Sequence, residues 1–167
     1  RLDVFVMSQC PFGVKALNAM EEVLSNFKGG IDFHVNYIAN ENGDGFSSLH
    51  GQGEVDENIR QLCAITHYTK DNKYMDYILC RNKNILGADW ESCTGGNGIQ
   101  TGVIKKCFEG DEGKRLLREN IKIGNGIGIS GSPTWLANNK HTFSGVDAET
   151  VKSNVCKYNP GLKGCEN

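Results

Sequence analysis

The sequence lacks a long hydrophobic run, and neither sign of charge dominates it. Its mainly apolar stretches, such as residues 2–7, are far shorter than the roughly 20 residues of a membrane span. Lysine and arginine number 18 and aspartate and glutamate 20, which gives a net charge of −2. This balance gives no electrostatic reason to bind nucleic acid or an anionic membrane. We therefore expect a soluble protein without a nucleic-acid partner.

The chain also lacks an initial methionine and a charged-then-apolar signal peptide. Because it begins at Arg1 and enters a strand-like segment within two residues, we expect that a segment upstream has been removed, with a signal peptide as one candidate. A length of 167 residues suits one domain, and we expect residues 1–167 to form a single domain.

Cysteine, in contrast, is abundant. Seven in 167 residues is a high number for a reducing cytosol and suits an oxidising compartment, so we expect an extracytoplasmic (periplasmic, secreted or lumenal) protein. No two cysteines lie two to four residues apart and no His-x-x-x-His pair exists, so we expect disulfides and no metal site. Six cysteines would then pair and one would stay free. The seven are Cys10, Cys63, Cys80, Cys93, Cys107, Cys156 and Cys165.

Hydrophobic periodicity predicts strands at both ends of the chain and helices in its middle. The expected order begins with a strand at 2–7, a helix at 13–27 and a strand at 31–38. A loop at 40–53 and four helices at 55–68, 73–81, 101–108 and 112–123 follow. The chain then ends with strands at 134–137 and 141–143 and a helix at 148–155, capped by Asp147.

This order predicts an α/β protein with a thioredoxin-like fold. A β-α-β half and a β-β-α half would share a mixed four-stranded sheet, with residues 54–126 as a helical insertion between them. Residues 156–167 would form a tail that has too few apolar residues to become ordered without a disulfide.

Cys10 is the most informative residue, because it lies where the first strand runs into the first helix. A thiol at a helix N-terminus faces unpaired backbone N–H groups and the positive end of the helix dipole, which favour the thiolate. Pro11 suits the first helical turn. We predict that Cys10 is a nucleophile in a Cys-Pro-Phe-Gly motif with Pro11, Phe12 and Gly13. The alternative is that Cys10 is a small buried apolar residue.

A second segment, Gly-Ile-Ser-Gly-Ser-Pro-Thr-Trp at 128–135, resembles a segment of the thioredoxin superfamily. Members of that superfamily carry a cis proline beside the active-site cysteine, and Pro133 matches it. The resemblance implies that Ser132 offers its backbone N–H and C=O to an extended substrate lying across Cys10. The alternative for Pro133 is an ordinary turn proline.

Residues 48–63 resemble the signature of the gamma-interferon-inducible lysosomal thiol reductase family. That signature has a Cys-Gln-His-Gly start followed by Glu-Cys, then Asn, then Cys. Ser48 and Val55 stand where the signature has two cysteines. The loss of both cysteines together is expected if the two pair with each other in the family. The resemblance covers roughly residues 2–143. The matching residues are His50, Gly51, Glu54, Asn58 and Cys63.

The Cys-Pro-Phe-Gly pattern resembles the DsbA-like bacterial branch near that family, in which single-cysteine motifs occur. Thioredoxin-like reductases and DsbA-like oxidases carry the second cysteine of Cys-x-x-Cys where this chain has Gly13. Another cysteine, an external thiol or a partner protein must then release Cys10 from a mixed disulfide. Residue 13 lies one helical turn from Cys10, so we expect Gly13→Cys to place a second thiol within bridging reach.

Three functions remain open from the sequence. The first is a thiol-disulfide oxidoreductase that acts through Cys10 on disulfides of proteins or small molecules, needs no cofactor, and uses a thiol or membrane redox partner. The second is a redox-inactive peptide-binding module. The third is a glutathione-dependent monothiol protein.

The six remaining cysteines allow several pairings. We expect Cys156 to pair with Cys165 across the turn at 159–161. Residues 63 and 80 are about equally distant from the turn of a helical hairpin at 68–72, so we prefer Cys63–Cys80 and Cys93–Cys107 for the other four.

Overall fold

The structure is a computed structural model that describes residues 1–166. The chain begins with a β-α-β unit of β1 (Leu2–Val6), α1 (Pro11–Phe27) and β2 (Phe33–Tyr37). It ends with β5 (Thr134–Ala137), β6 (His141–Phe143) and α6 (Ala148–Tyr158). The sheet has the order β2-β1-β5-β6, with β1 parallel to β2 and antiparallel to β5. The thioredoxin-like fold with a mixed four-stranded sheet is therefore confirmed.

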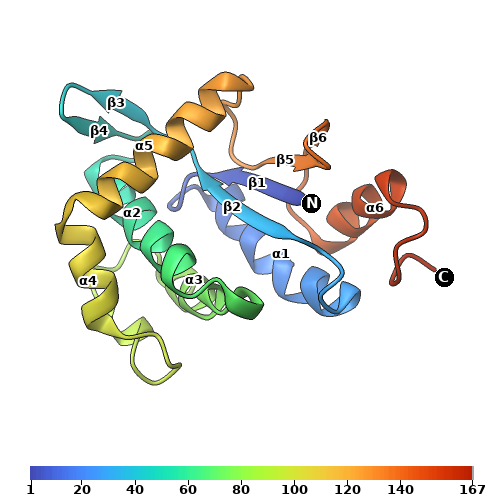
Figure 1. The fold of residues 1–167 in the computed structure, drawn as a ribbon, viewed down its shortest axis with the longest axis horizontal. Helices are drawn as coiled ribbons and strands as arrows, with labels where there is room; N and C mark the ends of the chain where they lie inside the picture. The colour runs from blue at the N-terminus through green and yellow to red at the C-terminus, as the bar shows by residue number, and fades with distance from the viewer. Residues whose placement is uncertain (167) are drawn as a thin grey trace.

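The central strand β1 is covered on both of its faces. All five of its residues are buried, so its side chains meet packing partners in both directions. Helix α6 packs beside α1, α5 packs against β2, and Figure 1 shows α1 and α5 on opposite sides of the β1–β2 pair. The C-terminal end of β1, where Cys10 follows, thus projects from a rigid three-layer core.

The β5–β6 hairpin and the cap of α6 follow from local chemistry. Asn138 and Asn139 form the hairpin turn with φ values of 54° and 59°, a backbone region that asparagine tolerates better than most residues. Asp147 Oδ1 accepts the Thr150 N–H at 2.8 Å and so caps α6. This bond and a second one from the Thr150 hydroxyl hold the pKa of Asp147 below its ordinary value.

Between the two halves lies a group of helices beside the sheet (Figure 1). Among the described residues, no helix combines the length and apolar character of a membrane span. The segment expected as a loop at 40–53 instead contains a short hairpin, whose strands are joined by a turn with Gly43 at φ 58°. The elements are β3 (Asn40–Asn42), β4 (Gly45–Ser47), α2 (Gln52–His67), η1 (Lys70–Asn72), α3 (Tyr74–Asn82), η2 (Glu91–Cys93), α4 (Thr101–Glu109) and α5 (Asp111–Gly126).

Two of the three expected disulfides are wrong. The structure joins Cys156 to Cys165 as expected, but it joins Cys63 to Cys107 and Cys80 to Cys93, in place of Cys63–Cys80 and Cys93–Cys107. Helices α2 and α3 do pack together, as the hairpin argument assumed. Two residues at equal distances from a turn lie at the same height along a pair of helices. The direction in which each side chain leaves its helix, however, decides which neighbouring element it faces. Cys63 faces α4, and Cys80 faces η2.

Loop length predicts unequal contributions of these two disulfides to stability. The Cys63–Cys107 bond spans 44 residues and the Cys80–Cys93 bond spans 13. The chain-entropy relation gives about 4 and about 3 kcal/mol. We expect the double variant Cys63→Ala/Cys107→Ala to lose more free energy of unfolding in urea than Cys80→Ala/Cys93→Ala. Equal losses, or a larger loss for the shorter loop, would contradict the expectation.

A buried charge organises the helical group. The Glu57 side chain is fully buried, and its Oε1 accepts a hydrogen bond from Arg60 Nε at 3.0 Å and lies 3.1 Å from Arg81 Nε. Its Oε2 accepts a bond from Gln61 Nε2 at 3.0 Å. Burial raises the pKa of the adjacent Tyr77 above its ordinary value, and the Glu57 charge adds to this effect. Two cationic side chains and one amide thus compensate the carboxylate for the lost water.

Candidate active site

Cys10 occupies the cap position at the N-terminus of α1. Its backbone is extended (φ −72°, ψ 123°), its C=O accepts the Val14 N–H at 2.9 Å, and Pro11 is the first helical residue. The helix begins at Pro11, two residues earlier than the periodicity predicts, so Cys10 directly precedes its first residue. Cys10 is 7% exposed. The thiol therefore lies beside the unpaired backbone N–H groups at the N-terminus of α1.

The second predicted segment lies against Cys10. The Ser132–Pro133 peptide bond is cis, as the resemblance implies. Cys10 Sγ is 3.7 Å from the Ser132 carbonyl oxygen, although the two residues are 122 positions apart in the chain. The structure thus brings Cys10, Ser132 and Pro133 together, in agreement with the sequence.

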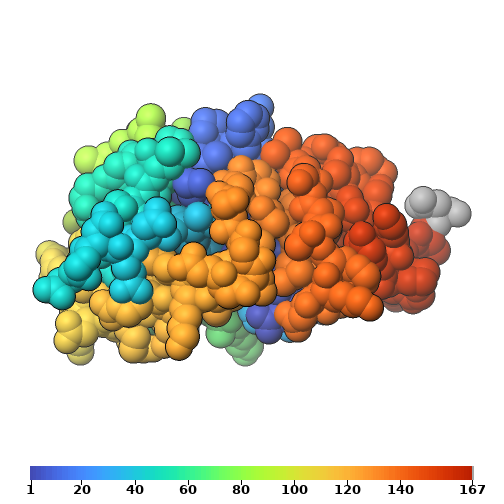
Figure 2. Space-filling view, turned by 90° about the horizontal axis from the view of Figure 1, so that it is seen from above, coloured from blue at the N-terminus to red at the C-terminus, as the bar shows by residue number. Residues whose placement is uncertain are grey.

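The three residues before Cys10, which we call the approach loop (residues 7–9), are hydrogen-bonded by side chains from two distant segments. In Figure 2, blue atoms of the N-terminal part of the chain reach the surface between teal atoms and orange atoms of later segments. Three consecutive backbone N–H groups each find a side-chain oxygen. Met7 N donates to Ser132 Oγ (2.9 Å), Ser8 N to Asn58 Oδ1 (3.0 Å) and Gln9 N to Glu54 Oε2 (2.9 Å).

The Glu54 carboxylate is the most heavily used of these acceptors. It is fully buried in the first turn of α2, where the helix dipole favours a negative charge. Besides Gln9 N, it accepts bonds from the Ser48 hydroxyl, His50 N (3.1 Å) and His50 Nδ1 (2.8 Å). The sequence placed these residues in a signature but did not reveal that they contact the approach loop.

Gly13 is the position where related motifs carry a second cysteine, and the space beside it is filled. A Cβ atom there would lie 2.8 Å from Ser132 Oγ and 3.0 Å from the Met7 carbonyl oxygen. Contacts this short require a neighbour to move. The prediction that Gly13→Cys places a second thiol within bridging reach of Cys10 therefore also requires the Ser132 hydroxyl and the Met7 carbonyl to shift.

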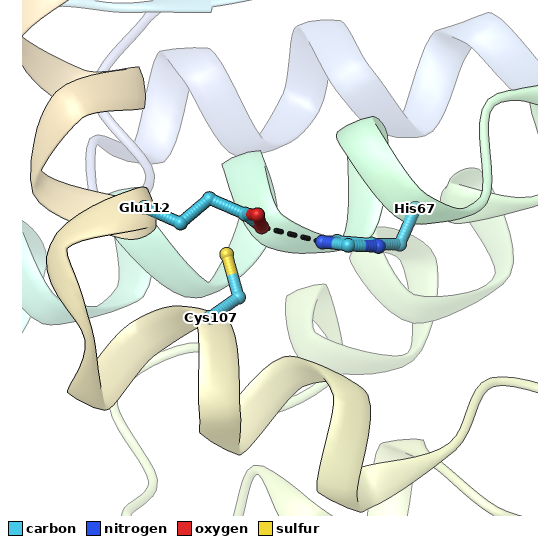
Figure 3. Close-up of side chains that lie close together, drawn as sticks. All are labelled: His67, Cys107 and Glu112. Carbon is cyan, nitrogen blue, oxygen red and sulfur yellow. Dashed lines mark hydrogen bonds and ion pairs between the residues drawn. The ribbon is translucent and has the colours of Figure 1, made fainter.

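A second cluster of ligand-type side chains lies on the helical group, away from Cys10. His67, Cys107 and Glu112 have ligand atoms within 4.8 Å of one another, and Figure 3 shows His67 hydrogen-bonded to Glu112 with the Cys107 sulfur beside them. The Cys107 sulfur is bonded to Cys63, so it offers no thiolate. Only two donors remain, too few for the four-coordinate site that zinc prefers.

Two exposed apolar side chains and a cavity lie close in sequence or structure to the residues that precede Cys10. Phe12 is 59% exposed and Leu49 is 77% exposed, unusually high values for large apolar residues. Leu49 also lines a cavity of about 480 Å³, together with Met7, Ile129 and Ser130, which precede Cys10 and Pro133 in the chain.

A cysteine at the start of α1, a cis proline in the segment that contacts it and a mixed four-stranded sheet are features of a thiol-disulfide oxidoreductase of the thioredoxin fold. Within that class, the family described as gamma interferon inducible lysosomal thiol reductase (GILT) matches residues 1–97, more than half of the chain. The chain belongs to this family. No curated protein sequence is significantly similar to it.

Solved structures show the same fold across almost the whole chain. BdbD from Bacillus subtilis has a TM-score of 0.68 at 15% identity, covering 96% of this chain and 86% of its own. The thiol-disulfide exchange protein alpha-DsbA2 from Wolbachia pipientis has a TM-score of 0.66 at 15% identity, covering 94% and 80%. A thioredoxin-like oxidoreductase from Silicibacter pomeroyi DSS-3 has a TM-score of 0.65 at 13% identity, covering 96% and 86%.

The family indicates the kind of substrate, and the disulfides indicate the kind of compartment. A thiol-disulfide oxidoreductase acts on substrates that carry disulfides. Three disulfides bind six of the seven cysteines, a pattern that fits an extracytoplasmic setting.

Proposed function

We propose that this protein exchanges disulfides through one cysteine, Cys10, and that a thiol from outside the chain completes each cycle. The observation that carries the proposal is the placement of Cys10. It is the free cysteine of the chain, it caps α1, and its sulfur faces the carbonyl of Ser132 at 3.7 Å. The other six cysteines are bonded to one another and supply no second thiol.

The exchange proceeds in two balanced steps. The Cys10 thiolate attacks one sulfur of the substrate disulfide, forming a mixed disulfide and expelling the other substrate sulfur as a thiolate. An external thiolate then attacks the substrate sulfur of that mixed disulfide. This second step restores the Cys10 thiolate and leaves the substrate sulfur joined to the external thiol. Net reduction of the substrate requires a second external thiol.

The substrate would lie extended across Cys10, beside the cis-proline segment. In this arrangement the backbone N–H and C=O of Ser132, whose carbonyl oxygen lies 3.7 Å from the Cys10 sulfur, would pair with the substrate. The exposed Phe12 and Leu49 side chains would contact apolar residues near the substrate disulfide. The substrate disulfide can belong to a protein or to a small molecule. The external thiol comes from a small thiol compound or from a redox partner, which can be a membrane protein.

The proposal also includes the compartment of the protein and the division of its chain. We infer a periplasmic, secreted or lumenal protein in which residues 1–167 form one domain and residues 54–126 are an insertion. Helices α2 to α5 lie between β4 and β5, which supports the insertion. The bond between Cys156 and Cys165 supports a stapled tail at 156–167.

Insulin reduction with and without glutathione tests the proposal. We expect turnover that requires glutathione, because the chain has no resolving thiol. Equal turnover without any external thiol would contradict the single-cysteine cycle. Absence of turnover in both conditions would favour a redox-inactive peptide-binding module, a function that the glycine at position 13 and the small exposed fraction of Cys10 also allow.

A further inference from the structure

The signature segment at 48–63 has two fully buried polar side chains on the face of α2 that meets the approach loop. Glu54 and Asn58 are four residues apart and therefore lie on one side of the helix. Each accepts a backbone N–H of the approach loop, and Ser8 Oγ additionally donates to the Glu54 carbonyl at 3.3 Å. One helical face thus contacts two successive residues immediately before Cys10.

These bonds matter because the approach loop lies beyond the end of β1. A buried N–H group without a partner costs about 1–3 kcal/mol, so each bond fixes the loop in one conformation. The bond to the Glu54 carboxylate is charge-assisted and therefore stronger than a bond to a neutral acceptor. Gln9 is bonded covalently to Cys10. The position of the Gln9 amide consequently sets where the Cys10 sulfur lies relative to the start of α1.

His50 sets the position of the acceptor itself. Its Nδ1 contacts Glu54 Oε2, the same oxygen that receives the Gln9 amide, and its backbone N–H contacts the other oxygen. The His50 side chain is 33% exposed, whereas that of Glu54 is fully buried. The contacts therefore run in a continuous series from a half-exposed imidazole through a buried carboxylate to the residue before Cys10.

We propose that His50, Glu54 and Asn58 are positioning residues that hold the Cys10 sulfur at the N-terminus of α1, and that this is the chemical role of the signature segment. The inference rests on the proposed function for its meaning in catalysis. It makes a separate claim about the position of the Cys10 sulfur, however, and this claim can be tested without turnover.

Alkylation of Cys10 by iodoacetamide in the native protein, followed against pH, tests this claim. The rate at high pH, where the thiol is ionised in every variant, reports access to the sulfur and therefore where the sulfur lies. We expect Glu54→Gln and Asn58→Ala to raise that rate about fivefold, because a loosened approach loop uncovers the sulfur of Cys10, which is 7% exposed in the native protein. In insulin reduction with glutathione, we expect kcat to fall about tenfold while KM changes less than about twofold.

The matched control is Gln61→Ala. Gln61 lies on the same helix and is also fully buried, but it contacts Tyr37 and Glu57 instead of the approach loop. We expect this variant to lose stability in urea with no shift of the alkylation profile. His50→Ala changes a half-exposed side chain, so we expect this variant to fold even if Glu54→Gln and Asn58→Ala do not. We expect it to change the alkylation profile in the same direction by a smaller amount.

Unshifted profiles in the folded variants, or an equal shift in Gln61→Ala, would overturn the proposal. The outcome is independent of the function above. Shifted profiles without insulin turnover in the wild type would retain the positioning role and reject the enzyme. Normal turnover with unshifted profiles would support the enzyme and reject the positioning role.

Discussion

The variant Cys10→Ser is expected to lose turnover in the glutathione-supported insulin assay, at least about a hundredfold and down to the uncatalysed rate. A serine hydroxyl in this position is not ionised at neutral pH and forms no mixed disulfide, whereas thiolate attack begins the proposed cycle. Stability should change by less than about 1 kcal/mol. Among residues 1–166, the side chain of Cys10 makes one weak hydrogen bond, of 3.7 Å to the Ser132 carbonyl, and serine differs little from cysteine in volume.

The control for this variant removes other cysteines far from the site. Cys156→Ser/Cys165→Ser opens a nine-residue separation and should cost about 3 kcal/mol, yet it leaves the β1–α1 junction unchanged. We expect it to retain turnover at a temperature where it is folded. Retention of activity by Cys10→Ser, or a parallel loss in the tail variant, would mean that Cys10 does not carry the exchange.

The second large effect is a gain. Gly13→Cys alone should destabilise the protein by about 1–3 kcal/mol, because its Cβ crowds the Ser132 hydroxyl and the Met7 carbonyl. Gly13→Cys/Ser132→Ala removes the hydroxyl, the closer of these two contacts, and leaves only the Met7 carbonyl to shift. We expect the pre-reduced double variant to reduce one equivalent of insulin disulfide without any external thiol. An intramolecular thiol at such a position has a very high effective concentration, so release of Cys10 should be at least about a hundredfold faster than with millimolar glutathione.

Ser132→Ala alone is the control for the gain, since it shares the loss of the Met7 bond and lacks the second thiol. It should show no reduction without an external thiol. If the folded double variant forms no disulfide between residues 10 and 13 under mild oxidant, the placement of Cys10 at the start of α1 is contradicted.

The features that the sequence predicts correctly are those set by local chemistry. The strand-to-helix junction at Cys10, the two-asparagine hairpin turn and the Asp147 cap depend on a few neighbouring residues, and the structure contains all three. The pairing of Cys156 with Cys165 is also local, because the tail between them is short.

The features that the sequence does not reveal depend on how distant segments meet. The partner of Cys63 is decided by the rotation of α2 against α4, which periodicity does not specify. Glu54 and Asn58 would be assigned to the surface by their polarity, since such side chains are rarely buried without partners. Their partners are backbone amides of the approach loop, and these cannot be read from side-chain identities.

The identity of the exchanging thiol is tested most directly by trapping its mixed disulfide. The native, non-reduced protein is incubated with glutathione disulfide, digested without reductant and mapped by mass spectrometry. We predict one glutathione per chain, attached to the peptide that contains Cys10 and removed by reduced glutathione. Glutathione found on any of the six other cysteines, or found on Cys10 only after the protein is denatured, would contradict the account.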